Sequence, residues 1–284
     1  MAKIIDGKAI AAEIREEVRA EAMQWREQGI VPKLAVVLVG DDPASVVYAN
    51  SKQKAAEKVG IDFELFHLAG NTPEAEVLSL IHKLNEDTSV HGIMVELPLP
   101  DHISKEKVME AVHPLKDVDG VHPVNRGYIL SGQEGLFPAT PQSCVEILLR
   151  SGVELKGKHA VIVGRGETVG KPLVFLLLKH HPTITICHSR TPDLGYHTRQ
   201  ADILIAAVGK AHLIKGDMVK PGAVVVDAGI NEVDGGITGD VDFESVKEVA
   251  GAITPVPGGV GSLTTALLFR NVLLGLKLQQ KQGK

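Results

Sequence analysis

The sequence predicts an α/β fold in which strands and helices alternate. Short, continuous apolar runs alternate with segments whose apolar residues recur at helical spacing. Asp-Pro and Thr-Pro pairs stand before several of the helical segments, where a capping side chain and a proline in the first turn are favoured. The length of 284 residues corresponds to about two domains, and 44% hydrophobic with 23% charged residues is typical of a globular protein with a buried core.

The N-terminal part of the chain shows the clearest alternation. Leu34 to Val39 is an uninterrupted apolar run that ends at a glycine, as expected of a strand buried on both faces. Asp42 followed by Pro43 predicts the start of the next helix. The elements predicted here are a helix over 8–28, a strand over 34–39, a helix over 43–59, a strand over 61–68, a helix from 73 to 84, a strand over 92–95 and a helix over 104–112. Such alternation indicates βαβ units and a mostly parallel sheet.

Residues 113–140 interrupt this pattern with closely spaced glycines and prolines and are predicted to be irregular. An irregular segment of this length is usually functional or lies at a domain junction. The alternation resumes at Thr140 and Pro141. The elements predicted after that point are a helix from 141, a strand over 160–163, a helix ending near 179, strands over 184–187, 203–206 and 224–227, and an apolar helix over 263–278.

Composition excludes several classes of protein. The net charge of −5 argues against a general nucleic-acid binder, and only residues 141–284 carry a positive excess, where a phosphate-bearing ligand is expected. Cys144 and Cys187 form no paired motif, which indicates reduced thiols and a cytoplasmic setting. We expect no signal peptide, because no basic segment followed by an apolar stretch opens the chain, and no membrane span, because no apolar run reaches about 18 residues. The 12 histidines match no zinc motif, so we expect no metal site.

Gly164, Gly166 and Gly170 follow one predicted strand and open the next helix. Glycines at such a turn let backbone amides approach a pyrophosphate, and the helix N-terminus adds partial positive charge. The spacing is one residue longer than the commonest dinucleotide motif, and Pro172 stands where a P-loop has Ser or Thr. We therefore expect a dinucleotide site here, with a ligand-free tight turn as the alternative.

The residues after the following strand bear on the choice of cofactor. That strand ends at Cys187, and His188, Ser189 and Arg190 come next. An enzyme that uses NAD places a carboxylate near this position to accept a hydrogen bond from the ribose 2′-hydroxyl. No carboxylate is present, whereas Arg165, Ser189 and Arg190 can bind a 2′-phosphate. NADP is therefore the expected cofactor and NAD the less favoured one; the alternative is that Arg190 only ends a strand at the surface.

Tyr48 and Lys52 are four residues apart, so they lie on one face of the predicted helix. The same spacing is found in short-chain dehydrogenases, but in that family the glycine loop precedes the tyrosine. Here Gly164 follows it by more than a hundred residues, which argues against that family. From spacing alone, a surface Tyr–Lys pair is the default interpretation.

A set of motifs occurs in one order along essentially the whole chain. The motifs are Gly40-Asp-Asp-Pro-Ala-Ser45, Tyr48-xxx-Lys52, Val95-Glu-Leu-Pro-Leu-Pro100, Lys116-Asp-Val-Asp-Gly120, Gly164-Arg-Gly-Glu-Thr-Val-Gly-Lys-Pro172, Cys187-His-Ser-Arg-Thr191 and Thr254-Pro-Val-Pro-Gly-Gly-Val-Gly261. With them the chain resembles the bifunctional methylenetetrahydrofolate dehydrogenase/methenyltetrahydrofolate cyclohydrolases. The resemblance implies NADP-dependent oxidation of 5,10-methylenetetrahydrofolate to 5,10-methenyltetrahydrofolate, and hydrolysis of that product to 10-formyltetrahydrofolate.

The resemblance also implies an architecture of two α/β domains flanking a cleft, the second being a Rossmann-like dinucleotide-binding domain. The implied boundaries are 1–140 for a folate-binding catalytic domain, with a helix over 263–284 packing back on it, and 141–262 for the NADP-binding domain. The implied partners are tetrahydrofolate derivatives and a second copy of the chain in a cytoplasmic homodimer, without nucleic acid or membrane. The implied role is in one-carbon metabolism and purine biosynthesis.

The resemblance further assigns roles to individual residues. Tyr48 matches the residue that stacks on the aromatic ring of the folate, Lys52 the catalytic lysine near the one-carbon bridge, and Asp119 the carboxylate that hydrogen-bonds the pterin. The expected catalytic residues are Lys52, Tyr48, Glu96 and Asp119. The expected substrate-binding residues are Tyr48, Lys52, Val95, Glu96, Leu97, Asp119, Pro257, Gly258, Gly259, Val260 and Gly261. The expected cofactor-binding residues are Gly164, Arg165, Gly166, Ser189, Arg190 and Ile230.

The sequence departs from the family pattern at two positions. Gly166 stands where the family usually has Ser, so the expected NADP preference rests on Arg165, Ser189 and Arg190. Glu96 replaces the family's Gln, the neutral partner of the catalytic lysine.

An ionised Glu96 beside Lys52 favours the ammonium, which makes the neutral amine about 10- to 1000-fold scarcer. One hypothesis is therefore a dehydrogenase whose cyclohydrolase activity is weak or absent. A Glu96 that is protonated and mimics an amide, or that acts as the base itself, keeps both activities. A non-catalytic folate- or nucleotide-binding protein is a further alternative.

Overall fold

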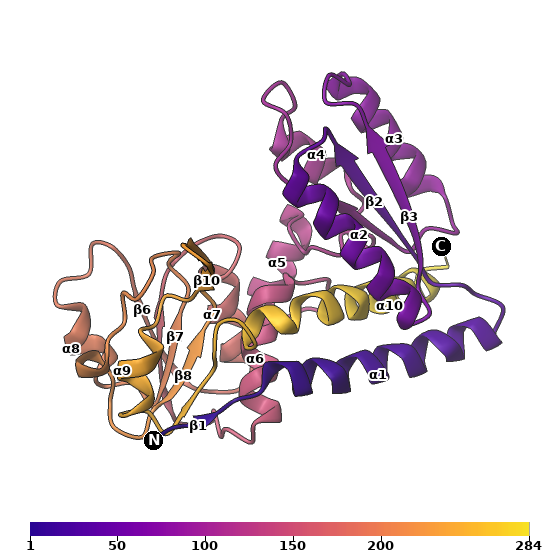
Figure 1. The fold of residues 1–284 in the computed structure, drawn as a ribbon. Coiled ribbons are helices and arrows are strands. Elements are labelled where there is room, and N and C mark those ends of the chain that lie inside the picture. The colour runs from indigo at the N-terminus through magenta and orange to yellow at the C-terminus, as the bar shows by residue number, and fades with distance from the viewer. Residues whose placement is uncertain (284) are drawn as a thin grey trace. The chain divides into compact units, whose positions relative to one another are not determined.

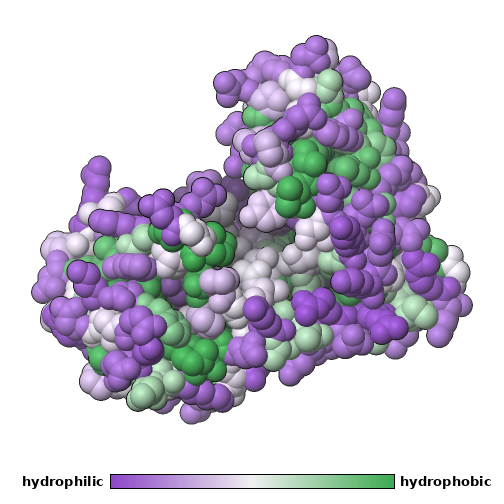
Figure 2. Space-filling view, in the orientation of Figure 1, coloured by the Kyte–Doolittle hydropathy of each residue, from purple (hydrophilic) through white to green (hydrophobic). Residues whose placement is uncertain are grey.

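The computed structural model describes residues 1–283 and divides into two compact units. One unit contains residues 1–13 and 138–264 and is called the glycine-loop unit below. The other contains residues 14–137 and the chain from Thr265 onward and is called the Lys52 unit. Helix α1 (Gly7–Glu27) begins in the first and continues in the second. The face shown in Figure 2 is mostly hydrophilic, with smaller hydrophobic patches. Within residues 1–283, no helix is long and apolar enough to cross a membrane.

The Lys52 unit is built on a three-stranded parallel sheet in the order β3-β2-β4. Its elements after α1 are β2 (Lys33–Val39), α2 (Pro43–Lys58), β3 (Asp62–Leu68), α3 (Glu74–Glu86), β4 (Gly92–Val95), α4 (Lys105–Ala111), α5 (Pro123–Ser131) and α10 (Thr264–Lys281). The chain passes from β2 to β3 on one side and then returns to place β4 on the other side of β2. This reversal is a topological switch point, and ligands of open α/β sheets bind at the carboxyl ends of the strands there.

The glycine-loop unit contains a six-stranded sheet in the order β1-β11-β8-β7-β5-β6, in which all neighbours are parallel. Its elements are β1 (Lys3–Ile4), α6 (Ala139–Arg150), β5 (His159–Val163), α7 (Gly170–Leu178), β6 (Thr183–Cys187), α8 (Leu194–Thr198), β7 (Ile203–Ala206), β8 (Val224–Asp227), the antiparallel pair β9 (Asn231–Val233) and β10 (Gly236–Thr238), α9 (Phe243–Lys247) and β11 (Ala252–Ile253). Here β6 and β7 lie on opposite sides of β5, so the second switch point is at the carboxyl end of β5.

The C-terminal helix α10, the yellow helix of Figure 1, is fixed to the Lys52 unit by buried polar contacts. The Asn271 side-chain amide donates to the carbonyls of Val118 (2.7 Å) and Phe137 (2.8 Å). Gly275 follows Asn271 by one helical turn. A Cβ at Gly275 would approach the Leu115 carbonyl oxygen to 2.7 Å. Only glycine therefore allows α10 this close to the loop after β4. The last residue of the expected 263–284 helix, residue 284, lies outside the described residues.

The prediction that residues 113–140 are irregular is wrong in part, because they contain α5. His122 caps this helix by accepting from the backbone N–H of Val124, Pro123 occupies its first turn, and Gly132 ends it at a φ of 73°. The same proline and glycine that suggested a loop are the start and stop signals of a short helix. The expected domain boundaries differ from the compact units at the N-terminus, where β1 pairs with β11 and so joins residues 1–13 to the glycine-loop unit.

Candidate active site

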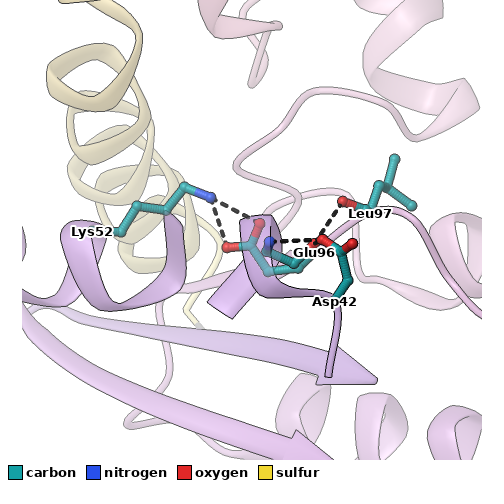
Figure 3. Close-up of polar contacts among 5 residues, drawn as sticks. Asp42, Lys52, Glu96 and Leu97 are labelled. Atoms are coloured by element: carbon teal, nitrogen blue, oxygen red, sulfur yellow. Dashed lines mark hydrogen bonds and ion pairs between the residues drawn. The ribbon is translucent and has the colours of Figure 1, made fainter. Parts of the chain in front are cut away.

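Helix α2 positions Lys52, and its first turn is fixed to the segment after β4 (Figure 3). The Asp42 carboxylate caps the helix by accepting from the Ser45 backbone N–H and hydroxyl, both at 2.8 Å. The Ser45 hydroxyl also contacts the Leu97 carbonyl oxygen at 3.2 Å. These hydrogen bonds lower the pKa of the Asp42 carboxyl. The cap thus connects the helix that carries Lys52 to the residue that follows Glu96.

Lys52 and Glu96 form a two-point ion pair (Figure 3). The Lys52 ammonium donates to both carboxylate oxygens of Glu96, at 2.6 and 2.9 Å. The two side chains are only 16% and 6% exposed. Glu96 comes directly after β4, and its backbone N–H continues the sheet by donating to the Val37 carbonyl (2.9 Å). A charged pair this far from solvent is screened much less than a surface ion pair, so removing either partner leaves a costly unpaired charge.

Asp119 is half-buried near this pair. The pKa of Asp119 is raised to about 7, mainly by burial and also by the negative charges of Asp117 and Glu96, while the positive charge of Lys52 opposes the rise. Asp117 is 2% exposed and accepts hydrogen bonds from the Asn125 side chain (2.9 Å) and the His122 backbone (2.9 Å). Lys52, Glu96 and Asp119 are therefore electrostatically coupled at the switch point of this unit.

The other expected residues of this unit divide by exposure. Tyr48, on the same helix as Lys52, is 64% exposed, and Leu97 is 42% exposed, so both side chains are accessible to a ligand. Val95 is 3% exposed and packs in the core of the unit. Only the backbone of Val95 remains for contact with a ligand.

The loop from Gly164 to Gly166 follows β5 at the second switch point. Gly164 has a φ of 126°, and a Cβ there would collide with the Ala207 carbonyl oxygen, so this position requires glycine. Arg165 and Gly166 are exposed, and no atom lies within 4 Å of where a Gly166 Cβ would be. The exposed backbone, the adjacent start of α7 and the Arg165 charge fit the pyrophosphate of a dinucleotide.

The expected 2′-phosphate residues lie in a turn after β6. Ser189 and Arg190 are both exposed there. The Arg190 backbone N–H donates to His188 Nδ1 (3.1 Å), and the His188 backbone N–H donates to the Thr191 hydroxyl (2.9 Å). This turn holds a cation and a hydroxyl at the carboxyl edge of the sheet, which fits an added phosphate and offers no carboxylate to repel it.

Ile230 follows β8 and is 62% exposed, which leaves an apolar surface available to an aromatic ring. The Pro257–Gly261 segment follows β11 in the same unit; Pro257 and Gly261 are exposed, Gly258 is half-buried, and Gly259 and Val260 are buried. A Cβ at Gly7 would collide with the Gly259 carbonyl oxygen, so the start of α1 packs directly on this segment. Within residues 1–283, no group of three or more His, Cys, Asp or Glu side chains is placed to hold a metal ion.

Four buried polar residues were not singled out from the sequence: Ser45, Asp117, Asp227 and Asp240. Ser45 and Asp117 lie inside motifs that were recognised, but neither was expected to be catalytic or to bind a ligand. Asp227 ends a predicted strand, and a carboxylate at the carboxyl end of a buried parallel strand was a usable signal. Asp240 carried no local signal, because its partners are more than twenty residues away in sequence or follow another strand.

Comparison with known proteins places the whole chain in one family. The model of the tetrahydrofolate dehydrogenase/cyclohydrolase catalytic domain matches residues 5–119, and the model of its NAD(P)-binding domain matches residues 138–280. The chain is 71% identical over 284 residues to the bifunctional protein FolD 2 of Desulfitobacterium hafniense, and each chain is covered completely.

Solved structures agree with this assignment. The bifunctional enzyme FolD of Campylobacter jejuni is 47% identical with a TM-score of 0.95, covering 98% of this chain and 100% of that one. The Trypanosoma brucei enzyme, solved with NADP and an inhibitor, is 35% identical with a TM-score of 0.90, covering 99% of each chain. These likenesses do not favour the alternatives of a missing cyclohydrolase activity or of a non-catalytic binding protein. The chain is a bifunctional enzyme of the tetrahydrofolate dehydrogenase/cyclohydrolase family.

Proposed function

We propose that the Lys52–Glu96 pair, with Asp119 and Tyr48, is the centre at which this enzyme transforms the one-carbon bridge of tetrahydrofolate. The reactions are the oxidation of 5,10-methylenetetrahydrofolate to the methenyl form and its hydrolysis to 10-formyltetrahydrofolate. The observation that carries the assignment is the buried two-point ion pair, at 2.6 and 2.9 Å, at the carboxyl ends of β2 and β4. Tyr48, exposed one helical turn before Lys52, supplies an aromatic face on which the folate rings stack.

The charge of the pair suits the first reaction. NADP⁺, when bound, accepts the hydride. Loss of that hydride converts a neutral methylene bridge into a methenyl cation, so positive charge develops at the substrate. Because Glu96 neutralises Lys52, the cation does not form beside an unpaired ammonium. Asp119 contributes a further carboxylate, which is ionised for part of the population near neutral pH because its pKa is about 7.

The second reaction requires proton transfer. The oxygen of water bonds to the methenyl carbon and, as the formyl C=O forms, loses both of its protons. The bond from that carbon to N5 breaks, N5 takes up one proton, and the other proton is released. The atom that can transfer protons at this point is Lys52 Nζ, which is hydrogen-bonded to both carboxylate oxygens of Glu96. The two-point contact, in which both Glu96 oxygens accept from Lys52, supports Glu96 as a carboxylate that holds the Lys52 side chain in place and not as a mimic of an amide.

We propose NADP as the cofactor of the glycine-loop unit, with Gly164, Arg165, Gly166 and Ile230 as contacts. The NAD(P)-binding model over residues 138–280 and the NADP-bound relative from Trypanosoma brucei support this. Arg190→Ala should weaken NADP⁺ binding about tenfold, because a charge-assisted hydrogen bond to the 2′-phosphate is lost, and leave NAD⁺ binding unchanged. An unchanged NADP⁺/NAD⁺ preference in calorimetric titrations would show that the 2′-phosphate does not bind at Arg190.

Further assignments extend this proposal. Residues 1–140 with the helix over 263–284 form the folate-binding catalytic domain, residues 141–262 form the NADP-binding domain, and Pro257–Gly261 is a folate-contacting segment. The enzyme acts as a cytoplasmic homodimer that supplies one-carbon units for purine biosynthesis. Family models over residues 5–119 and 138–280 support the domains. Sedimentation equilibrium tests the dimer, and a mass of one chain at micromolar concentration contradicts it.

The proposed reactions are tested by mixing the protein with methylenetetrahydrofolate and NADP⁺ and following NADPH and the methenyl product separately. We expect NADPH to form with little methenyl product accumulating. Accumulation of the methenyl product in amounts equal to NADPH contradicts the cyclohydrolase reaction. Absence of reduced nucleotide with either NADP⁺ or NAD⁺ contradicts the dehydrogenase reaction.

A further inference from the structure

Two buried carboxylates, Asp227 and Asp240, lie at the carboxyl edge of the six-stranded sheet and have no part in the roles described so far. Asp227 is the last residue of β8 and is 3% exposed, and Asp240 is fully buried. A buried carboxylate is costly unless its oxygens accept hydrogen bonds. The groups that donate to these two carboxylates therefore show what the carboxylates do.

Asp240 joins two segments that follow neighbouring strands. Its Oδ2 accepts from the backbone N–H groups of Val208 (2.6 Å) and Gly209 (3.0 Å), in the loop after β7. Its Oδ1 accepts from the backbone N–H of Lys210 (2.8 Å) in the same loop and from the Asn231 side-chain amide (3.0 Å), just after β8. Each carboxylate oxygen thus accepts two hydrogen bonds, and one side chain fixes both segments.

Asp227 in turn fixes the segment that carries Asp240. Its Oδ1 accepts from the backbone N–H of Asp240 (3.0 Å) and its Oδ2 from that of Val241 (2.8 Å). Each carboxylate also packs against a glycine that is close to the other carboxylate in sequence. A Cβ at Gly229 would collide with the Asp240 carboxylate, and a Cβ at Gly239 would collide with that of Asp227. This reciprocal packing leaves the carboxylates little freedom to move.

The segments held by Asp240 border the proposed cofactor site. The loop over 207–210 follows β7, which lies beside β5 at the switch point. Its first residue, Ala207, is in such close contact with Gly164 that a Cβ at Gly164 would collide with its carbonyl oxygen. Asn231 directly follows the exposed Ile230. A shift of the loop over 207–210 therefore moves the backbone that packs against Gly164, and a shift of Asn231 moves Ile230.

We propose that Asp240 is a positioning residue of the dinucleotide site, which holds the loop over 207–210 and the Ile230–Asn231 segment in the arrangement that binds the cofactor. The inference rests on the proposed placement of NADP at Gly164–Gly166. Asp240 acts through these backbone segments and need not touch the nucleotide. Both oxygens of a carboxylate are needed, because four donors face them and an amide can accept at only one of its two atoms.

The test is Asp240→Asn. In either orientation of the amide, its NH2 group faces two N–H donors, so the two segments must separate. We expect the calorimetric dissociation constant for NADP⁺ and the dehydrogenase KM for NADP⁺ to rise about tenfold or more. The dehydrogenase KM for methylenetetrahydrofolate should stay within twofold. Hydrolysis of methenyltetrahydrofolate without nucleotide should also stay within twofold, which shows that the variant is folded.

Two further variants keep the inference testable if Asp240→Asn folds poorly. Asn231→Ala removes one of the four donors and should raise the NADP⁺ dissociation constant two- to fivefold. The matched control is Asp202→Asn, which removes a carboxylate that accepts from the His159 backbone (2.9 Å) at the opposite edge of the same sheet. It should leave NADP⁺ binding unchanged.

The outcomes separate this inference from the placement of the cofactor. If Arg190→Ala weakens NADP⁺ binding and both Asp240→Asn and Asn231→Ala leave it within twofold, Asp240 is not a positioning residue. If none of the three variants changes the NADP⁺ dissociation constant, the nucleotide does not bind at this edge and both proposals are wrong. Equal losses of NADP⁺ binding and of nucleotide-free hydrolysis in Asp240→Asn would assign the residue a general structural role instead.

Discussion

Replacing Glu96 by Gln changes the charge beside the reacting carbon while nearly preserving shape. In the native protein both oxygens of Glu96 accept from Lys52, and the side chains are 6% and 16% exposed. The Gln variant leaves the ammonium with one carbonyl acceptor and adds one net positive charge to the site. At a distance of roughly 5 Å and an effective dielectric constant of about 20, the repulsion energy between this charge and the methenyl cation is about 3 kcal/mol. Solvent screening reduces this to about 2 kcal/mol.

This charge has opposite effects on the two reactions. Hydride loss creates the cation, so with about half of the charge developed at the transition state the dehydrogenase rate of Glu96→Gln should fall about fivefold. Hydrolysis consumes the cation, so it should not slow and should become up to about fivefold faster. The ratio of cyclohydrolase to dehydrogenase rate therefore rises about tenfold. The hypothesis drawn from the sequence, that Glu96 restrains hydrolysis by holding Lys52 as an ammonium, predicts the same direction.

The assay measures each step alone. Dehydrogenation is followed as NADPH formation from methylenetetrahydrofolate, and hydrolysis is followed as loss of methenyltetrahydrofolate without nucleotide. Glu64→Gln is the matched control, because it neutralises a carboxylate on β3 that is half exposed and pairs with Lys33 at 3.5 Å. The control should leave the ratio unchanged. A ratio in Glu96→Gln that is unchanged within twofold, or that falls, would refute the electrostatic reasoning.

Two further predictions concern stability. Lys116 is buried, and its ammonium donates to the carbonyls of Leu84 (2.9 Å), Asn85 (2.8 Å) and Asp87 (2.7 Å). Lys116→Met should therefore lower the free energy of unfolding by about 2–4 kcal/mol in urea titrations. A loss below about 1 kcal/mol would show that these contacts contribute little. Because the pKa of Asp119 is raised from 3.8 to about 7, the folded state binds this proton more tightly than the unfolded state, and stability is lost as pH rises from about 4 to about 7. Asp119→Asn should therefore stabilise the protein more at pH 8 than at pH 5, by up to about 2–4 kcal/mol, and an equal gain at both pH values contradicts the shift.

The elements that the sequence predicted well have local causes. The strand at Leu34–Val39 and the helix that starts at Pro43 are confirmed, because an uninterrupted apolar run and an Asp-Pro cap determine them within a few residues. The strands β1 and β11 were missed because each has two residues and exists only through pairing between the chain start and Ala252–Ile253. Helix α5 was missed because its proline and glycine signals were interpreted as those of a loop.

The residues of the candidate site could be predicted from single sequence motifs, but their geometry could not. The motifs placed Lys52 and Glu96 on separate segments, and the structure brings them into direct contact. Spacing could not give the two-point geometry, the half-buried position of Asp119 or the core position of Val95, because these depend on how α2, β4 and the loop after β4 pack. Asp240 is the clearest case: its four donors come from two loops that only the completed sheet brings together.

The most direct test of the account is the hydrolysis of methenyltetrahydrofolate by Lys52→Met, measured without nucleotide and beside the dissociation constant for NADP⁺. If the Lys52–Glu96 pair is the reacting centre, the hydrolysis rate falls about a hundredfold or more, as expected on loss of a proton-transfer group, while NADP⁺ binding is unchanged. A variant that still hydrolyses the substrate within threefold of the native rate would contradict the assignment of Lys52 and Glu96 to the centre of the enzyme.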